Sequence, residues 1–339
     1  MKFVTFQHSP SEARPGLVVG DKVLDLALAF REEETKAGRS TEAHVLEERY
    51  GRGVLGIVQN QDAVMPVVKA WEERMKAGDV PATVSGEALV HTYGEKAFLS
   101  PIPNPPSTRD GYAFRQHVQT ARKNRGLEMI PEFDEFPVFY FTNHHAIVGS
   151  GPVKVRARHL EKLDFELEAA IVVGRAGSDW TIEEADKAIF GLCIMNDWSA
   201  RVLQMDEMKL SLGPAKGKDF ATGLGPMLVT LDELADVTTK TDKGLVFDLQ
   251  MKCWVNGVQL SEGNVNQMNW TFAQILERVS YGVNVVPGEV IGSGTVGTGC
   301  LLELNGSGIT KNQWLQLGDK VDMEITRLGR LENTIVGGN

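Results

Sequence analysis

The 339-residue sequence has few cysteines, and they are not paired. Cys193, Cys253 and Cys300 are widely separated and odd in number, and no two of them form a C-x-x-C motif. Neither a disulfide framework nor a cysteine-based zinc site is therefore indicated. We expect three buried thiols in a reducing compartment.

Long apolar runs and an excess of positive charge are also missing. No hydrophobic stretch approaches the roughly 20 residues that span a bilayer, and residues 1–8 lack the apolar core of a signal peptide. The formal net charge of −10 argues against nucleic acid and anionic membranes as partners. With 42% hydrophobic and 24% charged residues the composition is that of a globular protein. We expect a cytoplasmic enzyme that acts on a small molecule.

Several common catalytic motifs are absent as well. The chain has no GK[ST] phosphate loop and no G-x-S-x-G nucleophile elbow. Residues 292–297, G-S-G-T-V-G, have the spacing of a dinucleotide-binding motif, but that motif follows a first strand and opens a helix. Here the motif lies late in the chain, before residues 300–304, which we predict to be a strand. We interpret it as a tight glycine loop that brings backbone N–H groups close to a ligand.

A proline-rich segment, P-I-P-N-P-P-S at residues 101–107, divides the chain. Its prolines disfavour helix and interior strand, so we expect an extended linker. Residues 1–100 are predicted to be a small module of short strands with helices around 26–32 and 64–75, the second with apolar residues at i, i+3, i+4 spacing. Residues 101–339 are predicted to be the catalytic domain.

Short strands dominate the predicted second domain. The β-prone stretches are 136–143, 163–174, 191–196, 248–255 and the residues from 258 onward. Asn256-Gly257 indicates a hairpin between the last two. The predicted helices are 110–125, 182–190 and 270–279. Many short strands with few helices favour an α+β, β-rich fold over a parallel βαβ sheet.

The stretch 163–174, L-D-F-E-L-E-A-A-I-V-V-G, contains Glu166 and Glu168 two residues apart. In a strand these carboxylates point to the same face. They repel one another unless a cation lies between them, and Mg²⁺, Mn²⁺ and Ca²⁺ prefer such oxygen ligands. A solvated strand face is the alternative, and it is the commoner case for an isolated Glu-x-Glu pair.

Two more acidic residues are candidates for the same site. Asp197 follows the apolar stretch 191–196, at a strand end where ligands are often found, although it could equally cap the next helix. Asp110 and His117 are seven residues apart. On a helix that spacing is two turns along one face, so both could reach one pocket. A capping aspartate and a surface histidine are the alternative.

Together these residues resemble the fumarylacetoacetate hydrolase family over roughly residues 101–330. The segments that carry the resemblance are Asp110 with His117, Glu166-x-Glu168, Asn196-Asp197-Trp198-Ser199-Ala200-Arg201, Gly217-Lys218-Asp219-Phe220, Ser293-Gly294-Thr295 and Glu303. The resemblance implies a mixed β-sandwich roll, a homodimer and a divalent metal held by four carboxylates. It also implies an N-terminal barrel-like module, which residues 1–100 could form.

The resemblance further implies a role for each matching residue. The implied metal ligands are Asp110, Glu166, Glu168 and Asp197. The implied catalytic residues are the base His117, its orienting partner Glu303, and the polar residues Lys218 and Gln204 near the substrate. The implied substrate contacts are Tyr140 and Thr295, with the hydroxyl of Thr222 behind the metal ligands.

One position departs from the family pattern. The family has an arginine nine residues after the histidine, where this chain has Gly126. The nearby residues Arg122 and Arg125 belong to a stretch, 111–125, with four cations and no acid. We predict that this stretch forms a lid and that one of these two arginines binds the distal carboxylate of a dianionic substrate. A solvated helix face is the alternative.

The residues and the resemblance predict a metal-dependent hydrolase that cleaves a carbon–carbon bond of a 1,3-diketo acid, with fumarylacetoacetate from tyrosine degradation as the expected substrate. An acylpyruvate hydrolase, an oxaloacetate decarboxylase and a dienoate hydratase are alternatives from the same superfamily. The pair His117 and Glu303 favours hydrolysis, because decarboxylation needs no base to activate water. A non-catalytic β-rich module stabilised by Ca²⁺ is the distant alternative, and it leaves Lys218, Gln204 and His117 without a purpose.

Overall fold

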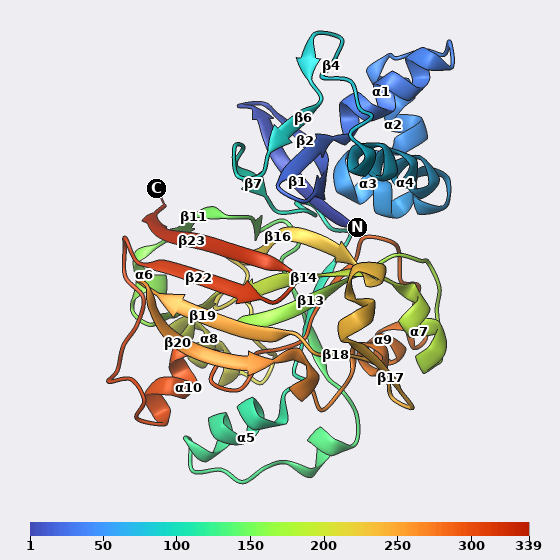
Figure 1. The fold of residues 1–339 in the computed structure, drawn as a ribbon. Coiled ribbons are helices and arrows are strands. Elements are labelled where there is room, and N and C mark those ends of the chain that lie inside the picture. Colours follow the sequence, from blue (N-terminus) through green and yellow to red (C-terminus); the bar gives the residue numbers. More distant parts are fainter. Residues whose placement is uncertain (339) are drawn as a thin grey trace.

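The structure is a computed structural model that describes residues 1–338. Residues 1–100 form a smaller lobe beside a larger body made by the rest of the chain (Figure 1). The elements of this lobe are β1 (Lys2–Ser9), β2 (Glu12–Val19), β3 (Lys22–Asp25), α1 (Leu26–Lys36), α2 (Ala43–Tyr50), α3 (Gly53–Gln59), α4 (Gln61–Ala77), β4 (Thr83–Val84), β5 (Glu87–Ala88), β6 (Val90–Thr92) and β7 (Phe98–Leu99).

The larger body contains the remaining elements. They are β8 (Thr108–Gly111), α5 (Arg115–Lys123), η1 (Pro131–Asp134), β9 (Phe139–Thr142), β10 (Ile147–Val148), β11 (Gly151–Val155), α6 (Ala157–Leu160), β12 (Leu163–Asp164), β13 (Leu167–Val173), α7 (Ile182–Ala188), β14 (Ile189–Asp197), β15 (Ser199–Ala200), α8 (Arg201–Met208), β16 (Thr222–Thr230), η2 (Leu231–Val237), β17 (Thr238–Thr241), β18 (Gly244–Phe247), β19 (Gln250–Val255), β20 (Val258–Asn264), η3 (Val265–Gln267), α9 (Phe272–Ser280), β21 (Val290–Gly292), α10 (Leu301–Gly306), β22 (Lys320–Ile325) and β23 (Gly329–Gly337). None of the helices within residues 1–338 is long and apolar enough to cross a membrane.

Two sheets organise residues 1–338. Twelve strands form a mixed sheet whose main order is β6-β3-β2-β1-β16-β14-β13-β21-β8-β9, and five form a second sheet in the order β11-β23-β22-β19-β20. The second sheet packs against one face of the first (Figure 1). The predicted α+β, β-rich class is confirmed, and so is the hairpin, with Asn256-Gly257 between β19 and β20.

The central strand β13 is buried on both faces, which explains its continuous apolar sequence. Ala169, Ile171 and Val173 face the core between the two sheets, whereas Ala170 and Val172 face a second core. The second core also contains residues of the N-terminal lobe, and β1 pairs directly with β16. The predicted boundary after residue 100 stays a prediction, since the two parts share both a sheet and a hydrophobic core.

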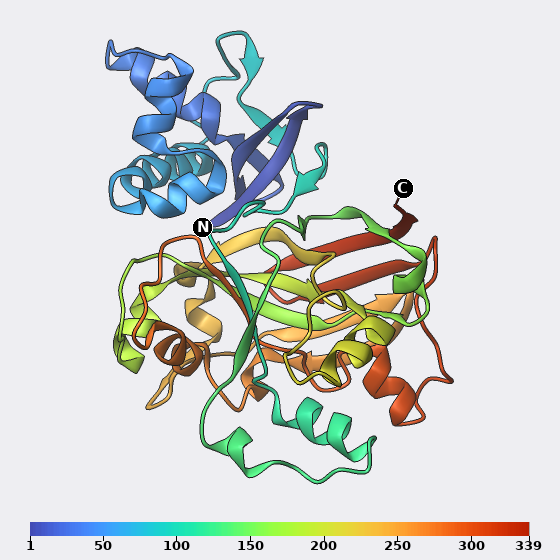
Figure 2. The ribbon, with the colours of Figure 1, turned by 180° about the vertical axis from the view of Figure 1, so that it is seen from behind.

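The predicted helix over residues 110–125 is wrong at its start. Asp110 lies in β8, which pairs in parallel with β21 and antiparallel with β9, and α5 begins only at Arg115. Asp110 and His117 are therefore not on one helix face. Figure 2 shows the chain passing from the N-terminal lobe along the back of the body and down to α5. Sheet pairing of a short, fully buried segment has overridden its local preference.

The predicted strand over residues 300–304 is also wrong, because these residues start α10. The side chain of Asp164 accepts hydrogen bonds from the backbone N–H groups of Leu301 and Leu302, at 2.7 and 2.9 Å. These N–H groups have no partner within a helix, so an acceptor 137 residues away in the sequence stabilises the helix start. This acceptor cannot be recognised from the local sequence.

Replacing Phe3 should test whether the N-terminal lobe and the central sheet unfold as one unit. Phe3 is fully buried, pairs with Leu228 across β1 and β16, and its ring lies 5.9 Å from that of Phe190. Phe3→Ala should reduce the free energy of unfolding by about 3–5 kcal/mol and keep a single cooperative transition in urea. Phe141→Ala, at a ring that is 63% exposed, is the matched control with a small effect. Separate transitions for the two parts would contradict a shared core.

Candidate active site and metal centre

The four predicted metal ligands come together at one end of the central strands. Asp110 lies on β8, Glu168 on β13 and Asp197 at the end of β14, and Glu166 precedes β13. One carboxylate oxygen from each lies within 4.8 Å of the others, and all four side chains are buried. Strand β21 pairs with β8 on one side and with β13 on the other. This arrangement brings the side chains of Asp110 and Glu168 close together.

The glycine loop after β21 shapes this cluster. A Cβ atom at Gly292 would lie 2.4 Å from Oδ1 of Asp110 and 2.9 Å from Oε2 of Glu168, so a larger residue would displace the ligands. The N–H of Gly294, at φ +77°, donates to both of these oxygens at 3.1 Å. The hydroxyl of Thr295 lies 3.4 Å from Oε1 of Glu168. The loop does present a backbone N–H, and in this structure it is directed at the carboxylates.

Two buried cations contact the other side of the cluster. Nζ of Lys218 lies 2.5 Å from Glu166 and 2.6 Å from Asp197, and Nη2 of Arg201 lies 2.8 Å from Glu166. If all four carboxylates are ionised, these two cations leave a net charge of at least −2 in a region shielded from water, since Arg201 also pairs with the buried Asp164. One divalent cation would balance that charge.

The pKa values of the carboxyl groups show which of them lack a balancing positive charge. Burial and the neighbouring Asp110 raise the pKa of Glu168 well above its usual value, and burial with the charge of Asp197 raises the pKa of Asp110 to about 8. Burial would also raise the pKa of Glu166, but the charges of Lys218 and Arg201 outweigh it and hold that pKa low. The raised pKa values show that Asp110 and Glu168 resist carrying two negative charges side by side, and a bound metal cation would relieve this.

The donor atoms fit a hard divalent cation. Within residues 1–338, Oδ1 of Asp197 is buried without a hydrogen-bond partner, while its Oδ2 accepts bonds from Lys218 and Tyr140. A buried carboxylate oxygen without a partner is costly, and a metal ion would satisfy it. All four ligands offer oxygen only, which suits Mg²⁺, Mn²⁺ or Ca²⁺.

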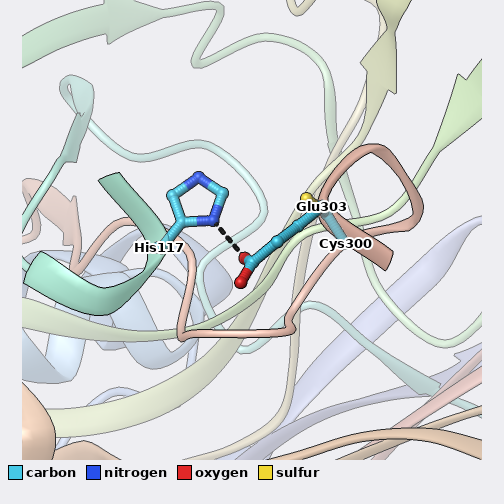
Figure 3. Close-up of side chains that lie close together, drawn as sticks. All are labelled: His117, Cys300 and Glu303. Atoms are coloured by element: carbon cyan, nitrogen blue, oxygen red, sulfur yellow. Dashed lines mark hydrogen bonds and ion pairs between the residues drawn. The ribbon is translucent and has the colours of Figure 1, made fainter. Parts of the chain in front are cut away.

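His117 and Glu303 form a hydrogen-bonded pair beside this cluster (Figure 3). Nδ1 of the imidazole, on α5, lies 2.7 Å from Oε2 of Glu303, on α10, and both side chains are buried. Holding the proton on Nδ1 leaves Nε2 free to accept one. The pKa of Glu166 is affected most by burial, Lys218 and Arg201, and the charge of His117 also lowers it, so the imidazole lies within electrostatic range of the carboxylate cluster.

Sequence reasoning missed Asp164 and Arg201. Nε of Arg201 donates to Asp164 at 2.8 Å, while its Nη2 donates to Glu166. Since Asp164 also binds the first turn of α10, it connects the helix that carries Glu303, through Arg201, to Glu166 of the carboxylate cluster. The available signal was the alternation of acids in D-x-E-x-E at 164–168, which extends the pattern that identified the two glutamates.

The other predicted residues fall into two groups. Gln204 accepts a hydrogen bond from Arg201 at 3.0 Å, and Thr222 is buried directly opposite Asp197 in the β14–β16 register. Arg122 and Arg125 instead donate to the backbone carbonyl groups of Glu128 and Ala121, within their own segment. Among residues 1–338, the structure does not bring these two arginines into contact with the carboxylates.

Tyr112 is a further residue that the sequence did not reveal. It lies two residues after Asp110, and its ring packs edge-on against the imidazole of His117 with centroids 5.8 Å apart. The imidazole therefore has two neighbours, the ring of Tyr112 and the carboxylate of Glu303. No motif in the sequence marked Tyr112, because its role depends on the turn between β8 and α5.

The family model described as "Fumarylacetoacetate (FAA) hydrolase C-terminal" matches residues 107–336. The chain belongs to this family. It is therefore an enzyme of a superfamily whose members act on carbon–carbon bonds of keto acids, and the roll-like fold expected from the resemblance is confirmed.

Two relatives in sequence and one similar solved structure illustrate the range of similarity. A fumarylacetoacetase from Oryza sativa subsp. japonica is 28% identical over 92% of this chain and 85% of its own length. The oxaloacetate tautomerase YisK from Bacillus subtilis (strain 168) is 25% identical over 85% of this chain and 98% of its own length. The structure of a maleylpyruvate hydrolase from Sphingobium sp. SYK-6, in complex with manganese(II) and pyruvate, has a TM-score of 0.66 and 17% identity, and each chain is fully covered.

Removing the metal should abolish activity in this family member. Without a cation the repulsion among the carboxylates is unbalanced, so chelation should inactivate the enzyme, and Mg²⁺ or Mn²⁺ should restore it. Glu168→Gln removes one ligand charge and should weaken Mn²⁺ binding in calorimetry by about tenfold or more. Glu183→Gln, at an exposed glutamate on α7, is the control. Full activity of a verified metal-free enzyme would disprove the assignment.

Asp164→Asn should slow catalysis while retaining the metal. The substitution keeps the side-chain shape but removes the charge that holds Arg201 and the start of α10, and such bonds contribute about 1.5–3 kcal/mol each. We expect kcat to fall about tenfold to a hundredfold, with Mn²⁺ affinity affected less than in Glu168→Gln. Asp186→Asn, at a buried aspartate that accepts the N–H of Leu245, should leave kcat unchanged. An unchanged kcat in Asp164→Asn would show that catalysis does not depend on the positioning of Arg201 and α10 by Asp164.

Proposed function

We propose that this protein is a divalent-metal-dependent hydrolase that cleaves a carbon–carbon bond of a 1,3-diketo acid. The expected substrate is fumarylacetoacetate, which would give fumarate and acetoacetate in tyrosine degradation. The observation that carries the proposal is the pair His117 and Glu303 next to the carboxylate cluster, because it combines a base of fixed tautomer with a site for a Lewis acid. The similarity to fumarylacetoacetases over nine-tenths of the chain supports this substrate class.

The four clustered carboxylates would hold the cation, and the bound cation would polarise the ketone oxygens of the substrate. The ligands are Asp110, Glu166, Glu168 and Asp197. The manganese in the similar maleylpyruvate hydrolase structure supports Mn²⁺ as one candidate, beside Mg²⁺ and Ca²⁺.

His117 would start the reaction. Its Nε2 takes a proton from water while Glu303 holds Nδ1–H and balances the positive charge that develops on the ring. The oxygen of that water adds to the substrate carbonyl carbon. Burial of both side chains keeps this ion pair away from bulk solvent, so its attraction is little screened.

Lys218 and Gln204 would stabilise the charge that then forms on the carbonyl oxygen. Burial would lower the pKa of Lys218, but Asp197 and Glu166 outweigh it and raise that pKa, so the ammonium group is charged throughout. Gln204 accepts from Arg201 through its carbonyl oxygen, which leaves its amide group to donate. The carbon–carbon bond then breaks, and the leaving enolate is protonated.

Tyr140 and Thr295 would complete the substrate site. Their hydroxyl groups lie 2.5 Å from Asp197 and 3.4 Å from Glu168, and these contacts with the carboxylate cluster support a role in substrate binding. We also propose that the protein is a homodimer in the cytoplasm, as the resemblance implies. Light scattering during gel filtration measures the subunit number.

A second candidate function is oxaloacetate chemistry, and one observation favours it. The alignment with YisK covers 98% of that tautomerase, against 85% of the rice fumarylacetoacetase. Keto–enol conversion needs proton transfer but no added water. Incubating the enzyme with fumarylacetoacetate, an acylpyruvate, a dienoate and oxaloacetate, and identifying the products in each case, separates hydrolysis from hydration, decarboxylation and tautomerisation.

His117→Ala should abolish most of the hydrolysis without removing the metal. General-base catalysis typically contributes about 10²- to 10⁴-fold in rate, so kcat should fall by that order. Metal content, measured by elemental analysis, should stay unchanged. His44→Ala, at an exposed histidine, is the control. If His117→Ala instead loses its metal, His117 is a ligand and the proposed mechanism is wrong.

The arginines near Gly126 should bind the distal substrate carboxylate when the α5 segment closes as a lid. Their present hydrogen bonds are made to the exposed backbone carbonyl groups of Glu128 and Ala121. These bonds can be exchanged for a bond to the substrate carboxylate. A lost Arg–carboxylate contact costs about 1.5–3 kcal/mol. Arg122→Ala or Arg125→Ala should therefore raise KM roughly tenfold to a hundredfold.

The comparison substrate is a matched diketo acid without the distal carboxylate. Its KM should not change in either variant, and Lys should replace the critical arginine poorly because it cannot form a bidentate contact. If both variants have the KM values of the parent enzyme for both substrates, residues 111–125 are a solvated helix face.

A further inference from the structure

A second group of metal-binding side chains lies beside the carboxylate cluster, and its donor atoms are of a different kind. It consists of His117, Cys300 and Glu303 (Figure 3). An imidazole nitrogen, the thiol sulfur and a carboxylate oxygen all lie within 4.8 Å of one another, and all three side chains are buried. This group shares no residue with the four carboxylates.

The two helices that carry these residues hold them in place. Cys300 is the N-cap of α10 and Glu303 lies three residues further on, so both face the same side of its first turn. His117 comes from α5, which packs against α10. The side chain of Asn124, at the end of α5, lies 3.4 Å from the carbonyl oxygen of Glu303. The three donors are therefore brought together by the fold before any ion arrives.

The donor set matches zinc better than magnesium. Zn²⁺ binds nitrogen, sulfur and carboxylate oxygen, often with three protein ligands and a water molecule in the fourth position. Bond lengths of about 2.0–2.3 Å place the ligand atoms roughly 3.2–3.8 Å apart on a tetrahedral ion. The present spacing, from 2.7 Å between His117 and Glu303 to at most 4.8 Å within the group, requires only small side-chain shifts. Mg²⁺ prefers the all-oxygen cluster.

We propose that His117, Cys300 and Glu303 form an inhibitory site for Zn²⁺. The ion takes the position of the proton between Nδ1 of His117 and Glu303, that proton moves to Nε2, Cys300 releases its thiol proton to solvent, and a water molecule completes the coordination. With Nδ1 bound to the ion, the neutral imidazole carries its proton on Nε2. Nε2 then donates and can no longer accept a proton from water.

The inhibition rests on the proposed role of His117 as the base, whereas the binding does not. Binding is therefore measured without substrate, by adding Co²⁺ to the full-length protein in excess Mg²⁺, which keeps the carboxylate cluster occupied. A thiolate bound to Co²⁺ gives a charge-transfer absorption band in the near ultraviolet. We expect this band in the parent protein, loss of the band when Zn²⁺ is added, and no band in Cys300→Ser.

Cys253→Ser is the matched control, because Cys253 is an equally buried thiol that lies on β19 outside the group. This variant should retain the cobalt band. A parent protein without the band, or a Cys300→Ser protein that keeps it, would overturn the proposed site. Cys300→Ala replaces Cys300→Ser if circular dichroism shows that the serine variant is unfolded.

Activity measurements test the regulatory consequence separately. In excess Mg²⁺, the Zn²⁺ concentration that halves the activity should rise about tenfold or more in Cys300→Ser and stay unchanged in Cys253→Ser. Equal inhibition of the parent and Cys300→Ser would show that zinc acts elsewhere and would overturn the inhibitory role. If no diketo acid is hydrolysed, the proposed function fails, and the cobalt spectra still decide whether the site exists.

Discussion

Electrostatic repulsion among four buried carboxylates is the constraint on which the site depends. Two like charges 4 Å apart repel by about 4 kcal/mol at an effective dielectric constant of 20, and here four carboxylates lie within 4.8 Å of one another. The positive charges of Lys218 and Arg201 balance the negative charge of Glu166. The backbone N–H of Gly294 only weakly balances the negative charges of Asp110 and Glu168. Burial first, and then the neighbouring carboxylates, raise the pKa values of Asp110 and Glu168.

The fold holds these charges together because the strands that carry them cannot shift. The central strand β13 is packed on both faces, by the second sheet on one side and by the N-terminal lobe on the other. Asp164 accepts hydrogen bonds from the backbone of α10, the helix that carries Glu303. Glu303 in turn forms a hydrogen bond with His117. The four clustered carboxylates, His117 and Glu303 thus depend on one connected network, as a site with small geometric tolerance requires.

Much of this site could be predicted from sequence, since the spacing of Glu166 and Glu168 and the position of Asp197 after an apolar stretch are local signals. The fold class also followed from many short strands separated by turns. The local sequence predicts a helix at Asp110, because β8 is only four residues long, T-R-D-G, and becomes a strand through pairing with distant segments. The local sequence does not predict α10, because Asp164, which stabilises its start, is remote in sequence. Contacts between distant segments are invisible to spacing arguments.

The most direct test of the central claim is to locate the metal by anomalous scattering. Crystals of the protein grown with Mn²⁺ would be measured on either side of the manganese absorption edge. The account predicts one strong anomalous peak among the oxygen atoms of Asp110, Glu166, Glu168 and Asp197, with Asp110 and Glu168 both bound to it. A peak at another position, or no peak in a protein that elemental analysis shows to contain manganese, would contradict it.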